Sequence, residues 1–341
     1  MNIISKLTKP EGTLTATAMA ITLLAACPAE GQIVFDDGKM HVISDATYAT
    51  ERIEVRNGSR LRITDGAVIS ALLGPNSEFA IQVFDNSLLI VQGGSFGGAE
   101  AFSGAIAAFD QSLVTIADGT FGKDGSFRSG MISVLDDANL NISGGTFTSA
   151  DGSGGRIETY DNGRANISDG NFGAQIHAMG RSIVAISGGR FGKDNPGGSP
   201  PFFRGAIFAR DTATVKISGG AFGVGTGFVV LSGALTVEGA AQAKISGGTF
   251  TGNPAFGNGV VLVQSPDAAA SIAGGHFDGT EIHVVAGQAT IDGCAFNLPF
   301  GPVSDLNTTL QGVLSNGDVI DAILTRDDAN ALIDLVEDCD L

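Results

Sequence analysis

Hydrophobic and polar positions recur along this chain with a period of about 25 residues. Each repeat holds two short runs in which apolar residues stand two apart, such as Ile132 and Val134 in one repeat and Val114 and Ile116 in another. This spacing is typical of β-strands that bury one face. A Gly-Gly or Asp-Gly step follows the second run and precedes an aromatic residue such as Phe147. The pattern therefore predicts three short strands in each repeat.

The position that ends each repeat occurs eleven times along the chain. These positions are Tyr48, Val68, Phe96, Phe121, Phe147, Phe172, Phe191, Phe222, Phe250, Phe277 and Phe296. Turn signals such as Asp37-Gly38 and Asn57-Gly58 separate the first two runs. Nine residues before the repeat end stands Ser, Ala or Gly in ten of the eleven repeats, which predicts a tightly packed buried face.

A period of this size predicts units that stack on their neighbours along one axis. The expected fold is all-β: a single-stranded parallel β-helix solenoid of about eleven coils, with three short strands per coil and each aromatic above the preceding one. A WD40-type propeller needs longer repeats, of about 40–45 residues. A helical solenoid is disfavoured, because Gly-Gly steps and β-branched residues two apart oppose helix formation.

Three segments are expected: a signal peptide of lipoprotein type at 1–26, a parallel β-helix at 27–296 and a C-terminal cap at 297–341. Within the cap, residues 310–320 predict a hairpin or a last coil with an Asn-Gly turn. Residues 327–336 predict a short helix. His41 occupies an apolar position of the first repeat, as expected of an end coil with one uncovered face.

The first residues have the features of a secretory signal. Lys6 and Lys9 give a positive start, and the uncharged apolar run from Thr13 to Ala26 is too short to span a bilayer.

The end of this run, Leu24-Ala25-Ala26-Cys27, resembles the lipobox of bacterial lipoproteins. The resemblance implies that Cys27 becomes the lipidated first residue and tethers the protein to a membrane of the bacterial cell envelope, with the outer membrane as the expected place. The alternative is ordinary cleavage near Ala26 or Ala29, which gives a secreted protein without an anchor.

Cys294 and Cys339 are the two other cysteines of the chain. In an oxidising compartment they are expected to form a disulfide that joins the C-terminal tail to the last coil. The alternative is two unrelated thiols.

Composition narrows the range of partners. The formal net charge is −17, with 36 acidic against 19 basic residues, so nucleic acid is a poor partner and self-association into stacks is disfavoured. A monomer is therefore expected, with a lipid anchor as its only membrane contact. The absence of Trp and the presence of two Tyr argue against an aromatic platform for sugars.

The Ile-Ser-Gly-Gly-x-Phe units resemble those of bacterial surface proteins and autotransporter passenger domains, and at the level of fold they resemble pectate-lyase-like proteins. Gly104-Ala105-Ile106 is similar to units of polymorphic outer-membrane proteins. The resemblance implies a right-handed parallel β-helix displayed at a cell surface. Lyases on this fold need several acidic Ca²⁺ ligands and an Arg or Lys base, and hydrolases need clustered carboxylates.

Acidic residues recur eleven positions before the repeat end, once per repeat. They are Asp85, Asp110, Asp136, Asp161 and Asp211. Because they occupy the same turn of successive coils, they are expected to form a column rather than a cluster. Turn chemistry is the favoured interpretation, structural Ca²⁺ is a weaker one and catalysis is the weakest. No catalytic, cofactor-binding or firm metal-binding residue is predicted.

Polar residues stand at the outward positions six and four before the aromatic. The pairs are Asn141 and Ser143, Asn166 and Ser168, Ala185 and Ser187, Lys216 and Ser218, and Lys244 and Ser246. Their irregularity and charge argue against an ice-binding face. The serines are interpreted as caps for the Gly-Gly turn. His177 and His276 lie at outward phases in different repeats, which does not indicate a metal site.

The segments after the aromatic vary most in length, and the longest, after Phe191, contains Lys193, Phe202, Phe203 and Arg204. Insertions on one face of a solenoid often form its binding face. The alternative is that the Phe pair folds back over its own coil. The predicted function is a non-enzymatic display or adhesion solenoid of the cell envelope, which binds a surface glycan or an envelope protein through this variable loop face. A polysaccharide lyase or hydrolase on the same scaffold is the alternative.

Overall fold

The structure is a computed structural model. It describes residues 32–48, 51–69, 79–97, 104–122, 129–147, 154–192, 206–223, 234–252, 260–327 and 330–338. Contacts divide the chain into residues 1–30 and residues 31–341, and all described residues belong to the second unit. The predicted signal segment with Cys27 therefore lies outside the described residues.

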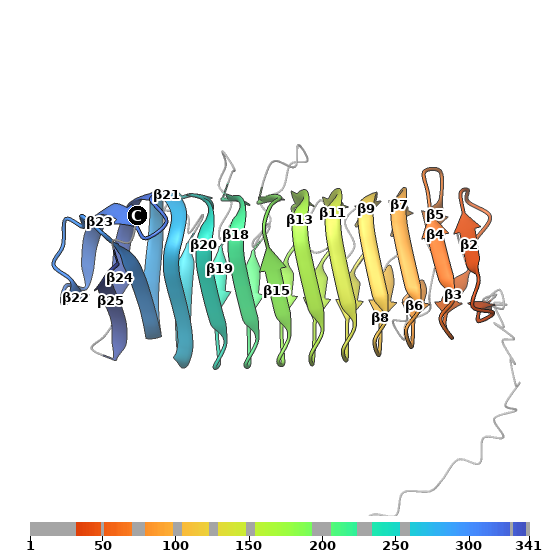
Figure 1. The fold of residues 1–341 in the computed structure, drawn as a ribbon, viewed down its shortest axis with the longest axis horizontal. Coiled ribbons are helices and arrows are strands. Elements are labelled where there is room, and N and C mark those ends of the chain that lie inside the picture. Colours follow the sequence, from red (N-terminus) through yellow and green to blue (C-terminus); the bar gives the residue numbers. More distant parts are fainter. Residues whose placement is uncertain are drawn as a thin grey trace, which may run out of the picture. The chain divides into compact units, whose positions relative to one another are not determined.

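The described residues form an all-β structure in which 25 strands belong to one hydrogen-bonded sheet. Strands of successive repeats follow one another side by side within residues 31–341 (Figure 1). No helix of membrane-spanning length and hydropathy occurs in the described part of the chain.

Each of the first nine repeats contributes one strand to a first row, and the row continues into β21 (Val261–Cys294). The row consists of β1 (Gln32–Phe35), β3 (Arg52–Val55), β6 (Ile81–Val83), β8 (Ile106–Ala108), β10 (Ile132–Val134), β12 (Ile157–Thr159), β14 (Ile176–Ala178), β17 (Ile207–Ala209) and β19 (Leu235–Val237). Neighbouring strands pair in parallel, so that Ile106, Ile132 and Ile157 occupy one register position.

A second row is formed by the other apolar run of each repeat. It consists of β2 (Met40–Ile43), β4 (Arg60–Ile63), β7 (Leu88–Phe96), β9 (Leu113–Phe121), β11 (Asn139–Phe147), β13 (Arg164–Phe172), β15 (Ile183–Ile186), β18 (Thr214–Phe222) and β20 (Gln242–Thr251), with the short β5 (Val68–Ile69) and β16 (Arg190–Phe191). These strands also pair in parallel, and Phe121, Phe147 and Phe172 share a register position.

The predicted third strand is separate only as β5 and β16, and the first repeat has none, because residues 44–48 after β2 form no strand. In the other repeats it continues the second-row strand across the Gly-Gly step. The register shifts at this step, as between Ile142 and Thr146 of β11. Gly145 has φ of 100°, which favours glycine. A Cβ on Gly144 would overlap the carbonyl oxygen of Ala117 in the preceding repeat. The step is therefore a glycine-dependent bend within one strand.

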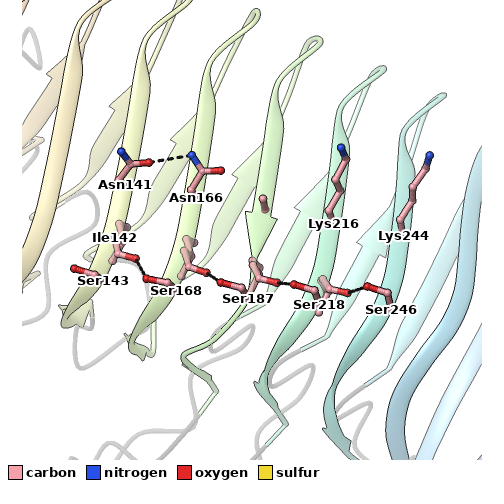
Figure 2. Close-up of a pocket in the computed structure, with 14 residues that line it drawn as sticks. Asn141, Ile142, Ser143, Asn166, Ser168, Ser187, Lys216, Ser218, Lys244 and Ser246 are labelled. Carbon is pink, nitrogen blue, oxygen red and sulfur yellow. Dashed lines mark hydrogen bonds between the residues drawn. The ribbon is translucent and has the colours of Figure 1, made fainter. Parts of the chain in front are cut away.

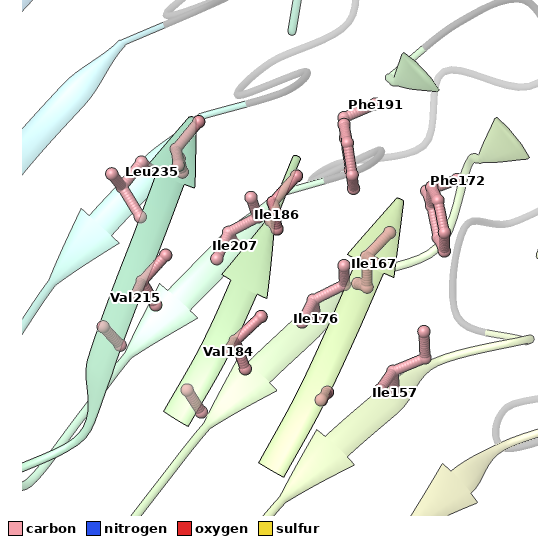
Figure 3. Packing of buried hydrophobic residues seen from close by; sticks show 14 of the residues in the cluster. Ile157, Ile167, Phe172, Ile176, Val184, Ile186, Phe191, Ile207, Val215 and Leu235 are labelled. Atoms are coloured by element: carbon pink, nitrogen blue, oxygen red, sulfur yellow. The ribbon is translucent and has the colours of Figure 1, made fainter. Parts of the chain in front are cut away.

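The core confirms the predicted apolar pattern. Both apolar residues of nearly every first-row and second-row strand are buried and belong to one continuous cluster. Figure 3 shows Ile157 and Ile176 of the first row facing Ile167 and Val184 of the second. The small residues nine positions before the aromatic are buried as predicted, with Ser112 and its counterparts almost fully inaccessible.

Eight phenylalanines form one continuous stack inside this core. They are Phe96, Phe121, Phe147, Phe172, Phe191, Phe222, Phe250 and Phe277. Successive ring centroids lie between 4.4 and 4.8 Å apart and the rings are almost parallel. This distance follows the spacing of adjacent strands, about 4.8 Å. The predicted placement of each aromatic over the preceding one is confirmed for these repeats.

The two ends of the stack differ from the prediction. Ile69, rather than Val68, pairs with Phe96, because this repeat has one more residue in its bend; Val68 is exposed. At the other end Phe277 pairs with Ile320, so the stack continues into the C-terminal segment. Phe296 lies outside the stack, with its ring tilted at 5.6 Å from the ring of Phe300.

The C-terminal segment is entirely β-structure where it is described. It comprises β21 (Val261–Cys294), β22 (Gly301–Pro302), β23 (Asn307–Leu314), β24 (Val319–Arg326) and β25 (Ala331–Glu337). The predicted hairpin is confirmed, since β23 and β24 are antiparallel around the turn at 315–318. The predicted helix at 327–336 is wrong: β25 pairs in parallel with β21, and Ala331, Ile333 and Leu335 alternate into the core.

Candidate functional site

The outward face of the second-row strands carries the most distinctive polar surface of the described structure. We call it the groove face and define it by two register columns. One column is Arg60, Leu88, Leu113, Asn139, Arg164, Ile183, Thr214 and Gln242, and the other is Arg62, Ile90, Thr115, Asn141, Asn166, Ala185, Lys216 and Lys244. These side chains point outward because they alternate with buried apolar residues along each strand.

A groove of about 730 Å³ crosses five strands of this face, from β11 to β20. It is lined by Asn141, Ile142, Ser143, Asn166, Ile167, Ser168, Ala185, Ile186, Ser187, Lys216, Ile217, Ser218, Lys244 and Ser246. Figure 2 shows the two asparagines side by side toward one end and the two lysines side by side toward the other. Ala185 stands between them on β15, where its small side chain leaves the middle of the groove open.

The asparagine end is organised by a side-chain hydrogen bond. Nδ2 of Asn166 donates to Oδ1 of Asn141 at 2.9 Å, as Figure 2 shows. Each amide group has further hydrogen-bonding capacity, because an amide offers two donors and one acceptor with two lone pairs. The pair therefore presents a donor and an acceptor at adjacent strands, fixed in orientation by their mutual bond.

The lysine end concentrates positive charge. Lys216 and Lys244 occupy the same register position of β18 and β20, and both side chains are exposed. In the described part of the chain neither ammonium group forms an ion pair. Arg210, by contrast, pairs with Glu238 at 2.9 Å.

The groove face as a whole is basic although the protein is acidic. Its two columns contain Arg60, Arg62, Arg164, Lys216 and Lys244, and neither column contains a carboxylate. The whole chain has a formal net charge of −17. The two columns are therefore a positive strip, which attracts anions from solution. The exposed Asp118 and Asp169 border this strip, and Asp169 is in register with Ser143 of the groove lining.

The serine column forms the floor of the groove. Oγ of Ser168 donates to the carbonyl oxygen of Ile142 in the preceding repeat at 3.1 Å, and the equivalent bonds of the other four serines measure 3.4–3.5 Å. The longer contacts are weak hydrogen bonds. The interpretation of these serines as caps of their own turn is wrong, because their hydroxyls reach across to the neighbouring repeat (Figure 2).

The aspartate column lies at the turn between the two rows. Asp85, Asp110, Asp136, Asp161 and Asp211 all have positive φ, between 51° and 58°. A carboxylate oxygen accepts a hydrogen bond from the backbone of the preceding repeat in four turns: Asp85 from Asn57, Asp110 from Asp85, Asp136 from Asp110 and Asp211 from Gly180. These contacts favour turn chemistry, because Asp tolerates this backbone conformation and its side chain ties adjacent turns together.

No group of three or more His, Cys, Asp or Glu side chains suited to a metal ion occurs among the described residues. Structural Ca²⁺ at the aspartate column therefore stays a prediction.

A second polar cluster lies on the first-row strands. Glu158 is buried, pairs with Arg156 at 2.6 Å and accepts a hydrogen bond from the Tyr160 hydroxyl at 2.7 Å. His177 occupies the neighbouring register position and stacks on Phe208 at 4.8 Å. Burial, together with the positive charges of Arg156 and Arg210, lowers the pKa of His177 to about 3. The imidazole is neutral at physiological pH.

His41 belongs to the first repeat, where it stacks on Phe35 and contacts Asp37 at 2.8 Å. The hydrogen bond from His41 holds the pKa of Asp37 at about 2.

Several predicted site residues lie outside the described residues: Cys27, Lys193, Phe202, Phe203, Arg204 and Cys339. Cys294 is half-buried at the end of β21, and its disulfide with Cys339 stays a prediction. The groove face was visible in the sequence as outward Asn, Lys and Ser residues. The sequence alone does not show that Lys216 and Lys244 lie together in a groove without carboxylates. Their position depends on how strands far apart in the chain are paired.

No protein-family model, curated protein or solved structure matches this chain. The site is therefore interpreted from its geometry.

Proposed function

We propose that residues 32–338 form a single-stranded parallel β-helix of about eleven coils, with one coil per sequence repeat. The parallel pairing of equivalent positions supports this proposal, as at Leu113, Asn139 and Arg164. The stack of eight phenylalanines supports it further, because identical residues meet when each repeat returns one strand spacing along the axis.

We infer that the protein is a non-enzymatic binding solenoid of the bacterial cell envelope, held there through lipidated Cys27 or secreted. The groove face is its contact surface for a surface glycan or an envelope protein. The observation that carries this function is the composition of the groove: amide, hydroxyl and ammonium groups line it, without a carboxylate among its lining residues. Such groups bind polar ligands without supplying the acid and base of a hydrolase.

The alternative of a polysaccharide lyase or hydrolase requires several carboxylates beside a basic residue in one cleft. The groove contains two lysines and no such carboxylates. Outside the groove, three clusters of described residues join carboxylates to basic groups: Glu158 with Arg156, Glu54 with Arg52 and Arg56, and His283 with Glu281 and Asp327. The groups of each cluster are engaged with one another, and none of them is among the residues that line the groove. Glycan retention without cleavage is therefore the expected behaviour.

The test combines binding with a search for cleavage. The purified mature protein is incubated with a panel of polysaccharides and with envelope fractions, with and without Ca²⁺, and both retention and polymer length are measured. Retention at constant polymer length is expected. Polymer shortening at any Ca²⁺ concentration would contradict the proposed function.

A pair of variants locates the contact surface. Ala185→Trp fills the middle of the groove, where the native side chain is small, and is expected to abolish retention. Asn171→Trp places the same bulk at an exposed position of β13 outside the groove and is expected to leave retention unchanged. Equal retention by both variants would place the contact surface elsewhere.

A further inference from the structure

The lysine end of the groove carries a charge arrangement that the fold itself does not require. Lys216 and Lys244 are in register on adjacent strands, about 4.8 Å apart along the sheet. Like charges directly opposite one another destabilise a sheet. No residue described in the structure compensates them with an ion pair. The two neighbouring lysines lower the stability of the fold and face an open groove. This is expected of a binding site in which the ligand supplies the negative charge that neutralises them.

The positions of the other cations extend this site along the strip. Arg164 lies on β13, two residues from Asn166 on the same outward face, and β15 separates it from Lys216. The cations thus follow one direction across the strands. A small anion contacts one end of this line, whereas a polymer that runs across the strands contacts its full length.

The groove lining narrows the class of polymer. Protein interfaces depend on aromatic and arginine anchors. The lining residues include no aromatic side chain, and the one arginine of the cation line, Arg164, lies beside the groove rather than among its lining residues. Single-stranded nucleic acid stacks its bases on aromatic side chains, which this groove also lacks. Amide and hydroxyl groups of Asn141, Asn166 and the serine floor match sugar hydroxyls, while the two lysines match acidic substituents.

We propose that the groove binds a linear polysaccharide that carries acidic groups, with Lys216 and Lys244 contacting those groups and Asn141 and Asn166 contacting neighbouring hydroxyls. This inference rests on the proposed binding function and specifies its ligand. The chemistry shared by the candidate ligands is a negative charge on a sugar chain, supplied by carboxylate or by sulfate.

Three polymers with one backbone separate these possibilities: dextran, carboxymethyl-dextran and dextran sulfate. Affinity of the mature protein is measured for each by biolayer interferometry over a salt series. Binding to one or both charged polymers above dextran is expected, weakening as salt rises because the contact is electrostatic. Whichever charged polymer binds more tightly identifies the acidic group.

Lysine variants provide the decisive comparison. Lys216→Gln and Lys244→Gln are each expected to weaken binding about fivefold, and the double variant about 25-fold, since each cation near an anionic surface contributes about 1 kcal/mol. Lys39→Gln, at an exposed lysine outside the groove, is the matched control and is expected to bind like the native protein. Because both groove lysines are exposed, the variants are expected to melt at or above the native temperature.

The possible failures are distinguishable. Equal affinity for dextran and both charged polymers, or native affinity in the double lysine variant, overturns this inference while binding without cleavage still supports the proposed function. Failure to bind either charged polymer also overturns the inference. Shortening of any of the polymers contradicts the proposed function itself. Tight binding of poly(A) RNA or polyglutamate that matches the charged dextrans overturns the assignment to a polysaccharide.

Discussion

The backbone N–H of Asp85 donates a hydrogen bond of 3.0 Å to Oδ2 of Asp110, the residue at the same position of the next repeat. Asp110 repeats the relationship with Asp136 at 3.2 Å. Each of these aspartates has positive φ, a backbone conformation that Asp tolerates. The carboxylates of Asp110 and Asp136 in addition join each turn to the turn of the preceding repeat.

The first prediction concerns this double role at Asp110. Asp110→Ala is expected to lower the free energy of unfolding by about 1–3 kcal/mol, because it loses a charged hydrogen-bond acceptor and places Ala at φ of 56°. Asp110→Asn keeps the turn and an acceptor oxygen and is expected to cost less. Asp110→Gly, which accepts the backbone but lacks the acceptor, is expected to lie between them. Urea denaturation ranks the three variants, and equal stability would contradict the proposed role.

The second prediction concerns the phenylalanine stack. Phe147 is fully buried with rings on both sides, so Phe147→Ala is expected to cost about 3–5 kcal/mol. Phe109, which stacks on Phe84 at 4.9 Å but is less buried, provides the control. Phe109→Ala is expected to cost less than half as much in the same urea denaturation. Equal costs would mean that burial inside the core is not the source of the difference.

The third prediction concerns pH. The pKa of His177 is about 3 in the folded protein, below its usual 6.5, because burial disfavours the charged ring. Between pH 6.5 and pH 3 the unfolded chain therefore binds a proton at His177 that the folded chain does not bind. The free energy of unfolding is highest above pH 6.5 and falls as pH decreases toward 3. The contribution is about 1.4 kcal/mol per pH unit within that window.

His177→Gln is expected to flatten this part of the pH profile in thermal melts. His276→Gln, at an exposed histidine of β21, is the control and should retain the native slope. A native slope in His177→Gln would contradict the assignment.

The fourth prediction concerns the two distal cysteines. Glu337 pairs with Gly293, and the amide of Asp338 donates to the carbonyl of Gly293 at 3.0 Å. Cys294 follows Gly293 in sequence, and Cys339, outside the described residues, follows Asp338. A disulfide between them is expected, with a stabilisation of about 3–4 kcal/mol. Mass spectrometry of unreduced peptides detects the bridge, and complete alkylation of both thiols without reductant would refute it.

The fifth prediction concerns the N-terminus. Mature protein from a bacterial host with lipoprotein processing is expected to begin at Cys27 and to carry acyl chains, which intact-mass measurement detects. Cys27→Ser is expected to leave the protein unacylated and to release it from the membrane fraction. An unmodified native N-terminus after Ala26 or Ala29 would contradict the lipid anchor.

The repeating middle of the fold was predictable because local pattern and tertiary contact coincide there. Each apolar pair packs on the equivalent pair of the next repeat, so Ile132 meets Ile106 and Ile157 without any long-range choice. The ends were less predictable. The replacement of Phe296 by Ile320 in the stack depends on a pairing between β21 and β24 that no local signal specifies.

The segment at 327–336 shows how a local pattern misleads. Its apolar residues fit a short helix, yet Ala331, Ile333 and Leu335 alternate as a strand because β21 offers an unpaired parallel edge. The groove face was harder to predict from the sequence than the C-terminal strand. Lys216 and Lys244 are 28 positions apart, and their proximity appears only once the register between β18 and β20 is known.

The register between equivalent positions of neighbouring repeats also limits which deletions and insertions the fold accepts. Removing residues 148–172 deletes one period, so Phe147 would meet Phe191 just as Phe172 does now, with every hydrophobic contact reformed. Removing half that length would turn apolar residues toward water throughout the remainder. Within the strands, insertions and deletions are thus expected in whole units, whereas the segments after the aromatic vary in length between repeats. The groove can therefore lengthen or shorten by one strand at a time without redesign of its interior.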